Sequence, residues 1–120
     1  MNLEIVYRIA LIQLPGIGDL YAKLLTEYFK SAQYLFNASK NELSEIPGVG
    51  DVLLSTLCSD SLKNKAIESA KHEIEFAEKY GISIWSYDDK NYPAKLKECH
   101  DGPFIVYYKG APVLNTAKII

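Results

Sequence analysis

The chain has 120 residues, enough for one ordinary domain or for a small helical domain and the start of another. Its 13 basic and 15 acidic side chains give a net charge of −2, which excludes a strong overall attraction to polyanions. No apolar run approaches the ~20 residues of a membrane-spanning helix. Cys58 and Cys99 are too far apart in sequence for a metal clip and predict reduced thiols in a cytoplasmic protein without membrane partners.

The strongest pattern is an internal repeat, in which residues 14–25 return 32 positions later as residues 46–57. Each copy contains an apolar residue, Pro, Gly, a β-branched residue, Gly and Asp, followed by apolar residues at helical spacing. Glycine permits positive φ in such a turn, and the turn presents the first N–H groups of the next helix, which can hold a phosphate. The repeat predicts two helix-hairpin-helix units in tandem. Such tandems resemble the sequence-independent DNA-binding units of repair and recombination proteins.

The candidate nucleic-acid contacts lie in the two turns and at two lysines. In many DNA-binding copies a Lys or Arg follows the second glycine, but here Asp19 and Asp51 occupy these positions. A carboxylate there predicts an N-cap, which would compete with phosphate for the first N–H groups of the helix. Lys23 is placed to reach a phosphate one turn later, which ranks the first hairpin above the second. A turn that only packs remains the alternative for each copy. The candidates are Gly16, Ile17, Gly18, Lys23, Gly48, Val49, Gly50 and Lys109.

The rest of the first 80 residues has helical periodicity. Apolar spacing predicts a helix over residues 2–13 that ends before Pro15. Ser31 and Ser39 predict the N-caps of two short helices, and Gly81 predicts the end of a long helix with an apolar stripe over residues 62–80. The further expected helices are 19–30, 32–37, 40–46 and 51–58. Residues 1–80 are therefore expected to form an all-α domain.

After Gly81 the pattern changes to that of strands. Residues 82–87 alternate in polarity, residues 104–108 are continuously apolar and aromatic, and a short helix over 93–99 is expected between them. This order predicts two parallel strands of an α/β sheet within residues 81–120. Residues 117–120 are expected to begin a further strand, so the chain is expected to be part of a longer protein. The predicted fold class is α+β.

Residues 92–110 carry spaced identities: Tyr92, Pro93, Leu96, Asp101, Pro103, Lys109 and Gly110. They resemble the Tyr-Pro-x-x-Leu, Asp-x-Pro and Lys-Gly signature of the bacterial DNA-processing protein A (DprA) family. The resemblance extends over the whole chain and implies a sterile-alpha-motif-like helical domain over residues 1–80 and the start of an extended Rossmann-like domain over residues 81–120. That family's Gly-rich loop would begin after Ile120.

The resemblance implies a non-enzymatic mediator that holds single-stranded DNA in natural transformation and competence and loads the RecA recombinase on it. Most of the DNA contact would then come from the part of the parent protein beyond this chain. A homodimer of the full-length protein is among the expected assemblies. The signature residues themselves are expected to be structural, except that Lys109, at a strand end, is a second-rank candidate for a phosphate contact.

Two other functions stay open: a protein-interaction module without DNA contact, and the accessory helix-hairpin-helix domain of a DNA repair enzyme. No catalytic cluster, cofactor or metal is expected within these residues. Glu68, His72 and Glu75 share a helix face, but their charged neighbours favour a solvated surface. Cys99, His100 and Asp101 contain the residue types of a catalytic triad, but sequence neighbours seldom face one another, and we reject that interpretation.

Overall fold

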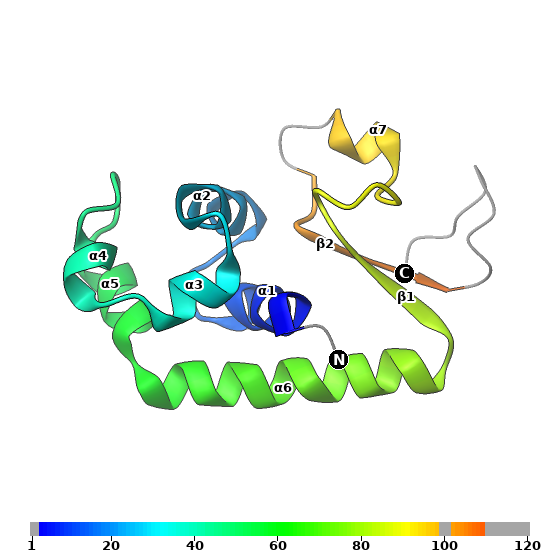
Figure 1. The fold of residues 1–120 in the computed structure, drawn as a ribbon, viewed down its shortest axis with the longest axis horizontal. Coiled ribbons are helices and arrows are strands. Elements are labelled where there is room, and N and C mark those ends of the chain that lie inside the picture. Colours follow the sequence, from blue (N-terminus) through cyan, green and yellow to red (C-terminus); the bar gives the residue numbers. More distant parts are fainter. Residues whose placement is uncertain (1–2, 99–101, 110–120) are drawn as a thin grey trace.

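The computed structural model describes residues 3–98 and 102–109, which form a helical part and a small sheet (Figure 1). The long helix α6 runs along one side, and α1 and α5 pack against it. The helices α2 and α3 pack on α1, and α4 packs on α5. The two strands lie toward the C-terminal end of α6, with α7 beyond them. The elements are α1 (Leu3–Gln13), α2 (Asp19–Phe29), α3 (Ala32–Asn37), α4 (Lys40–Ser44), α5 (Asp51–Cys58), α6 (Asp60–Lys79), β1 (Ile82–Ser86), α7 (Ala94–Lys97) and β2 (Ile105–Lys109).

Local sequence signals explain where most helices begin and end. The Ser31 hydroxyl accepts from the N–H of Tyr34, and Ser39 forms a capping box with Glu42, so both predicted N-caps are confirmed. Gly81 follows α6 with φ +67°, the left-handed conformation that glycine tolerates best. Three predicted helices are shorter than expected: 19–30 ends at Phe29, 40–46 ends at Ser44, and 93–99 is reduced to Ala94–Lys97.

The core joins the helices to the beginning of β2. Phe104 is fully buried, and Ile105 beside it is also buried in the same apolar cluster as α1, α2 and α6. The main contributors from the helices are Val6, Ile9, Leu11, Leu14, Ile17, Leu25, Leu35, Leu43, Leu57, Ala66, Ala70 and Ile74. Segments on either side of residue 80 therefore share one core.

The predicted parallel strand pairing is wrong. β1 and β2 pair antiparallel, with Ile82 opposite Lys109 and Ser86 opposite Ile105. The chain turns back at the end of β1, where Asp89 N–H bonds to the Ser86 carbonyl and Tyr92 N–H to the Asp89 carbonyl. A parallel connection needs a crossover that passes over the sheet, usually a full helix, and the four-residue α7 is too short for that. The described residues therefore form a two-stranded antiparallel sheet, and the start of a Rossmann-like domain is not confirmed.

The second face of the sheet has a small aromatic core. The Trp85 and Tyr108 rings stack 4.9 Å apart, and Leu96 of α7 packs against this cluster. The buried Tyr92 donates its hydroxyl hydrogen to the Pro103 carbonyl at 2.6 Å. The structural roles predicted for Tyr92 and Leu96 are therefore confirmed. The predictions for Cys99, His100, Asp101, Gly110 and residues 117–120 fall outside the described residues.

Within the described ranges, no helix is both long and apolar enough to cross a membrane.

Candidate nucleic-acid interface

The two turns of the sequence repeat have the same backbone conformation. Gly16 and Gly48 have φ of +82° and +83°, and each precedes a residue whose N–H closes the turn. The equivalent hydrogen bonds are Ile17 N–H to Leu14 O and Val49 N–H to Ile46 O, both 3.3 Å, and Ala22 N–H to Gly18 O and Leu54 N–H to Gly50 O, both 2.9 Å. The predicted tandem of hairpins is therefore repeated in three dimensions. We call residues 14–18 hairpin one and residues 46–50 hairpin two.

The second glycine of each hairpin is not required by the fold. Gly18 (φ −94°, ψ −178°) and Gly50 (φ −87°, ψ 172°) are N-caps in extended conformations that any residue adopts. A Cβ atom built at either position meets nothing within 4 Å. Ser, Asp or Asn would cap these helices better than glycine, yet both helices begin without a side-chain cap. Each position is thus a bare backbone surface that another molecule can approach closely.

The predicted capping role of Asp19 and Asp51 is wrong, because Gly18 and Gly50 occupy the N-cap positions. Asp19 is the first helical residue, and its Oδ1 accepts a hydrogen bond from Phe104 N–H at 3.0 Å. The Asp19 carboxylate is therefore directed to β2 and does not cap the start of α2.

The middle residue of each turn faces inward. Ile17 is buried in the core, and Val49 is half-buried against it. These two candidates can therefore offer only backbone groups to a ligand, whereas Gly16, Gly18, Gly48 and Gly50 are all exposed.

Lys23 is already engaged within the protein. Its Nζ donates to the Gly102 carbonyl at 2.5 Å and lies 5.8 Å from the centre of the Tyr87 ring. These contacts tie α2 to the segment before β2. A phosphate contact by Lys23 stays a prediction, and such a contact would compete with this arrangement.

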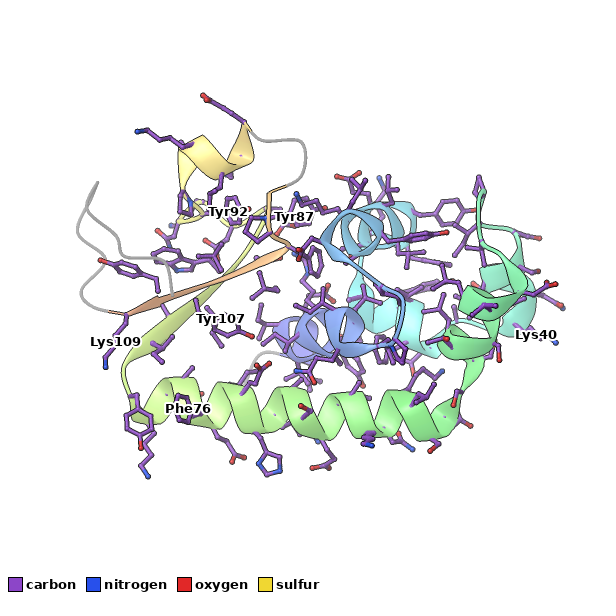
Figure 2. The ribbon with its side chains drawn as sticks, turned by 180° about the vertical axis from the view of Figure 1, so that it is seen from behind. Lys40, Phe76, Tyr87, Tyr92, Tyr107 and Lys109 are labelled. Atoms are coloured by element: carbon purple, nitrogen blue, oxygen red, sulfur yellow. The ribbon has the colours of Figure 1, made fainter. Side chains whose placement is uncertain are left out.

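Lys109 lies far from hairpin two. It is exposed at the end of β2, and Figure 2 shows it at the opposite end of the molecule from Lys40, the first residue of α4. The two hairpins share one apolar core through Leu14, Ile17, Ile46 and Val49, whereas Lys109 lies at the end of the molecule away from α4.

The sequence reasoning missed a buried charged residue, Arg8. Its Nη1 donates to Ser86 Oγ and Asp88 Oδ1, each at 2.5 Å, and its Nε donates to Glu4 Oε2 at 2.9 Å. The guanidinium carbon is also 6.0 Å from the centres of the Tyr87 and Phe104 rings. A single arginine in a largely apolar helix, four residues after Glu4, was the available signal. Arg8 connects α1 to the end of β1.

Glu4 also caps α3 from a distance. Its carboxylate accepts from Ser31 Oγ at 2.7 Å, Ala32 N–H at 2.8 Å and Gln33 N–H at 3.2 Å. Burial by itself would raise the pKa of Glu4, but the hydrogen bonds from Arg8 and α3 outweigh burial, and the pKa is lowered. Glu4 and Arg8 border a groove of about 480 Å³ whose other charged lining residues, Glu78, Asp88 and Asp89, are acidic. This lining makes the groove unsuited to phosphate.

In the part of the chain that the structure describes, no three His, Cys, Asp or Glu side chains lie close enough to hold a metal ion. Glu68, His72 and Glu75 are all exposed on α6.

Comparisons with known proteins agree with the hairpin geometry. Residues 9–63 match the family described as "SAM-like Helix-hairpin-helix tandem", and this segment contains both hairpins. The chain is also similar to the DNA ligase of Thermosipho africanus (strain TCF52B), with 31% identity over 91 residues. The DNA ligase of Oenococcus oeni (strain ATCC BAA-331 / PSU-1) is 30% identical over 86 residues.

The two matches cover 75% and 70% of this chain but only 13% and 12% of the ligases. The chain therefore spans about an eighth of the length of these relatives. The predicted helix-hairpin-helix tandem is confirmed for residues 9–63.

Proposed function

We propose that residues 9–63 bind the phosphate backbone of DNA without reading its sequence, as a non-catalytic accessory unit of a larger DNA repair or DNA-joining protein. One observation carries this proposal. Each hairpin leads into a helix that has no side-chain cap and whose N-cap residue is a glycine, although neither the backbone conformation nor the packing requires glycine there.

The chemistry of these two sites suits phosphate. The first N–H groups of a helix point outward, and the positive end of the helix dipole favours an anion there. A glycine at the N-cap removes the side chain that would otherwise stand between these donors and the ligand. Phosphate contacts fix position on the duplex but carry no sequence information, so binding is expected to be independent of sequence.

The charge of the chain supports an accessory role. Affinity for DNA grows with the number of phosphates that basic side chains neutralise, and here the net charge is −2. We expect weak binding by this chain alone and tighter binding when further DNA contacts come from a larger protein. The similarity to a short stretch of two DNA ligases fits such an arrangement.

The second candidate is a mediator of the DNA-processing protein A type, which would hold single-stranded DNA and load RecA. The spaced identities from Tyr92 to Gly110 favour it. A Rossmann-like domain beginning at β1 would have supported this function, but β1 and β2 pair antiparallel. We therefore rank the mediator second.

Amide mapping by NMR tests the proposal. The ¹⁵N-labelled chain is titrated at low salt with a short duplex and, separately, with a single strand of equal length. We expect shifts of residues 16–20 and 48–52, of similar size for unrelated sequences and reduced by salt. Shifts confined to residues 82–109 with single-stranded DNA alone would favour the mediator. The absence of shifts at both hairpins would overturn the proposed function and favour a protein-interaction module.

A further inference from the structure

One side chain joins α2, the helix that follows hairpin one, directly to hairpin two. The Tyr21 hydroxyl donates a hydrogen bond to the Gly48 carbonyl at 2.7 Å. Tyr21 lies in the first turn of α2, three residues after the N-cap Gly18, and Gly48 is the positive-φ residue of hairpin two. This hydrogen bond therefore links the start of α2 to the turn that leads into α5.

The contact is not a by-product of the repeated motif. The residue equivalent to Tyr21 in the second copy is Leu53, which has no hydroxyl and packs against the core. The Tyr21 ring also packs against the core, whereas its hydrogen bond to Gly48 lies at the surface. A Cβ at Gly48 would lie 4.0 Å from the Tyr21 oxygen, so the hydroxyl sits directly against the turn.

We propose that Tyr21 is a positioning residue, which holds the two hairpins as one preset clamp for two phosphates of the same DNA molecule. This inference rests on the proposed function. Two contacts on one ligand strengthen binding most when their relative position is fixed beforehand, because no ordering cost arises on binding. Tyr21 supplies that fixed position without touching the DNA through its own hydroxyl, which is occupied by Gly48.

The size of the expected effect follows from the hydrogen bond. One hydrogen bond has a net worth of about 1 kcal/mol, so removal of the bond from Tyr21 to Gly48 should lower DNA affinity by roughly 3- to 10-fold. Loss of the same hydrogen bond should lower the melting temperature by only about 3–6 °C, so the variant stays folded under the conditions of the binding assay.

The test compares Tyr21→Phe with Tyr87→Phe in the full chain. Tyr87 also donates an exposed hydroxyl hydrogen bond to α2, to Glu27 Oε1 at 3.3 Å, but this contact involves neither hairpin. Amide hydrogen exchange and relaxation dispersion over residues 46–50 are measured without DNA. Affinity for a short duplex is measured in two backgrounds, the natural chain and Gly50→Asp, which places a carboxylate at hairpin two in space that is free.

We expect Tyr21→Phe, and not Tyr87→Phe, to increase motion at residues 46–50 and to weaken binding in the natural background. In the Gly50→Asp background the same change should have almost no further effect, because hairpin two no longer contributes. An equal loss in both backgrounds, or unchanged motion and affinity, would overturn the positioning role while leaving the proposed function standing. If Gly50→Asp alone leaves DNA binding unchanged, hairpin two makes no DNA contact and the clamp is overturned; the proposed function is overturned only when Gly18→Asp also leaves binding unchanged.

Discussion

Asp19 and Phe104 are joined by a hydrogen bond of 3.0 Å, in which the first residue of α2 accepts from the backbone just before β2. One turn further along α2, Lys23 donates to the Gly102 carbonyl. The segment before β2 therefore fixes the position of α2, the helix that follows hairpin one, while Gly16 and Gly18 remain exposed. The charged side chains of Asp19 and Lys23 are therefore engaged in long-range contacts within the protein, whereas the exposed backbone of hairpin one is accessible to a ligand.

Replacing Arg8 should destabilise the fold. Arg8→Met removes three hydrogen bonds and leaves Asp88 and Glu4 without their cation. We expect the free energy of unfolding to fall by about 2–3 kcal/mol. The loss of a fully buried ion pair would cost more, but Asp88 is half exposed. Urea denaturation measures the difference. Lys65→Met on the exposed face of α6 is the control and should stay within about 0.5 kcal/mol of the natural chain. An equally small change for Arg8→Met would show that the network contributes little.

Stability should fall in acid through Glu4 and Asp88. Burial opposes their ionisation, but hydrogen bonds, from Arg8 above all, hold the pKa of each below its ordinary value of 4.5 or 3.8. A carboxyl group with a lowered folded pKa stabilises the protein above its unfolded pKa, and this contribution disappears as the pH falls through the folded value. The free energy of unfolding should therefore decrease below about pH 4.5.

Glu4→Gln isolates one part of that pH dependence. This variant should be less stable than the natural chain at neutral pH, and the difference should narrow on acidification, because only the natural carboxylate is neutralised. Urea titrations at several pH values give both curves. Parallel curves would contradict the assigned role of Glu4.

Side chains at the first glycine of each hairpin should strain the backbone. Gly16→Ala and Gly48→Ala place a Cβ at φ +82° and +83°, which costs about 1–2 kcal/mol for an L-residue. Thermal unfolding should show a lowered melting temperature for both. Gly18→Ser is the matched control, since it adds a capping hydroxyl at an extended position and should not lower the melting temperature. Equal losses of melting temperature at positions 16 and 18 would contradict the special backbone requirement at Gly16.

The amino-acid sequence predicted correctly those features of the fold that depend on residues close together in the chain. The repeat predicted both hairpins, and Ser31, Ser39 and Gly81 predicted caps that depend on neighbours within a few residues. The direction of β2 was mispredicted because strand order alone does not fix how the chain turns between strands. Ser86 and Asp88, which accept from Arg8, and Phe104, which donates to Asp19, lie about 80 residues away from these residues in sequence, and no local pattern reveals these contacts. For the same reason the link from Tyr21 to Gly48 could only be found in the structure.

The most direct test of the DNA-binding role is the double variant Gly18→Asp, Gly50→Asp, with stability and DNA affinity measured on the same samples. Both positions have the extended conformation and the free space that an aspartate N-cap needs. We predict a melting temperature that rises by about 1–3 °C through capping. We also predict a roughly tenfold or greater loss of affinity for a short duplex, with a salt slope smaller by about two. A rise in melting temperature with unchanged affinity and salt slope would contradict the account and make both hairpins packing turns.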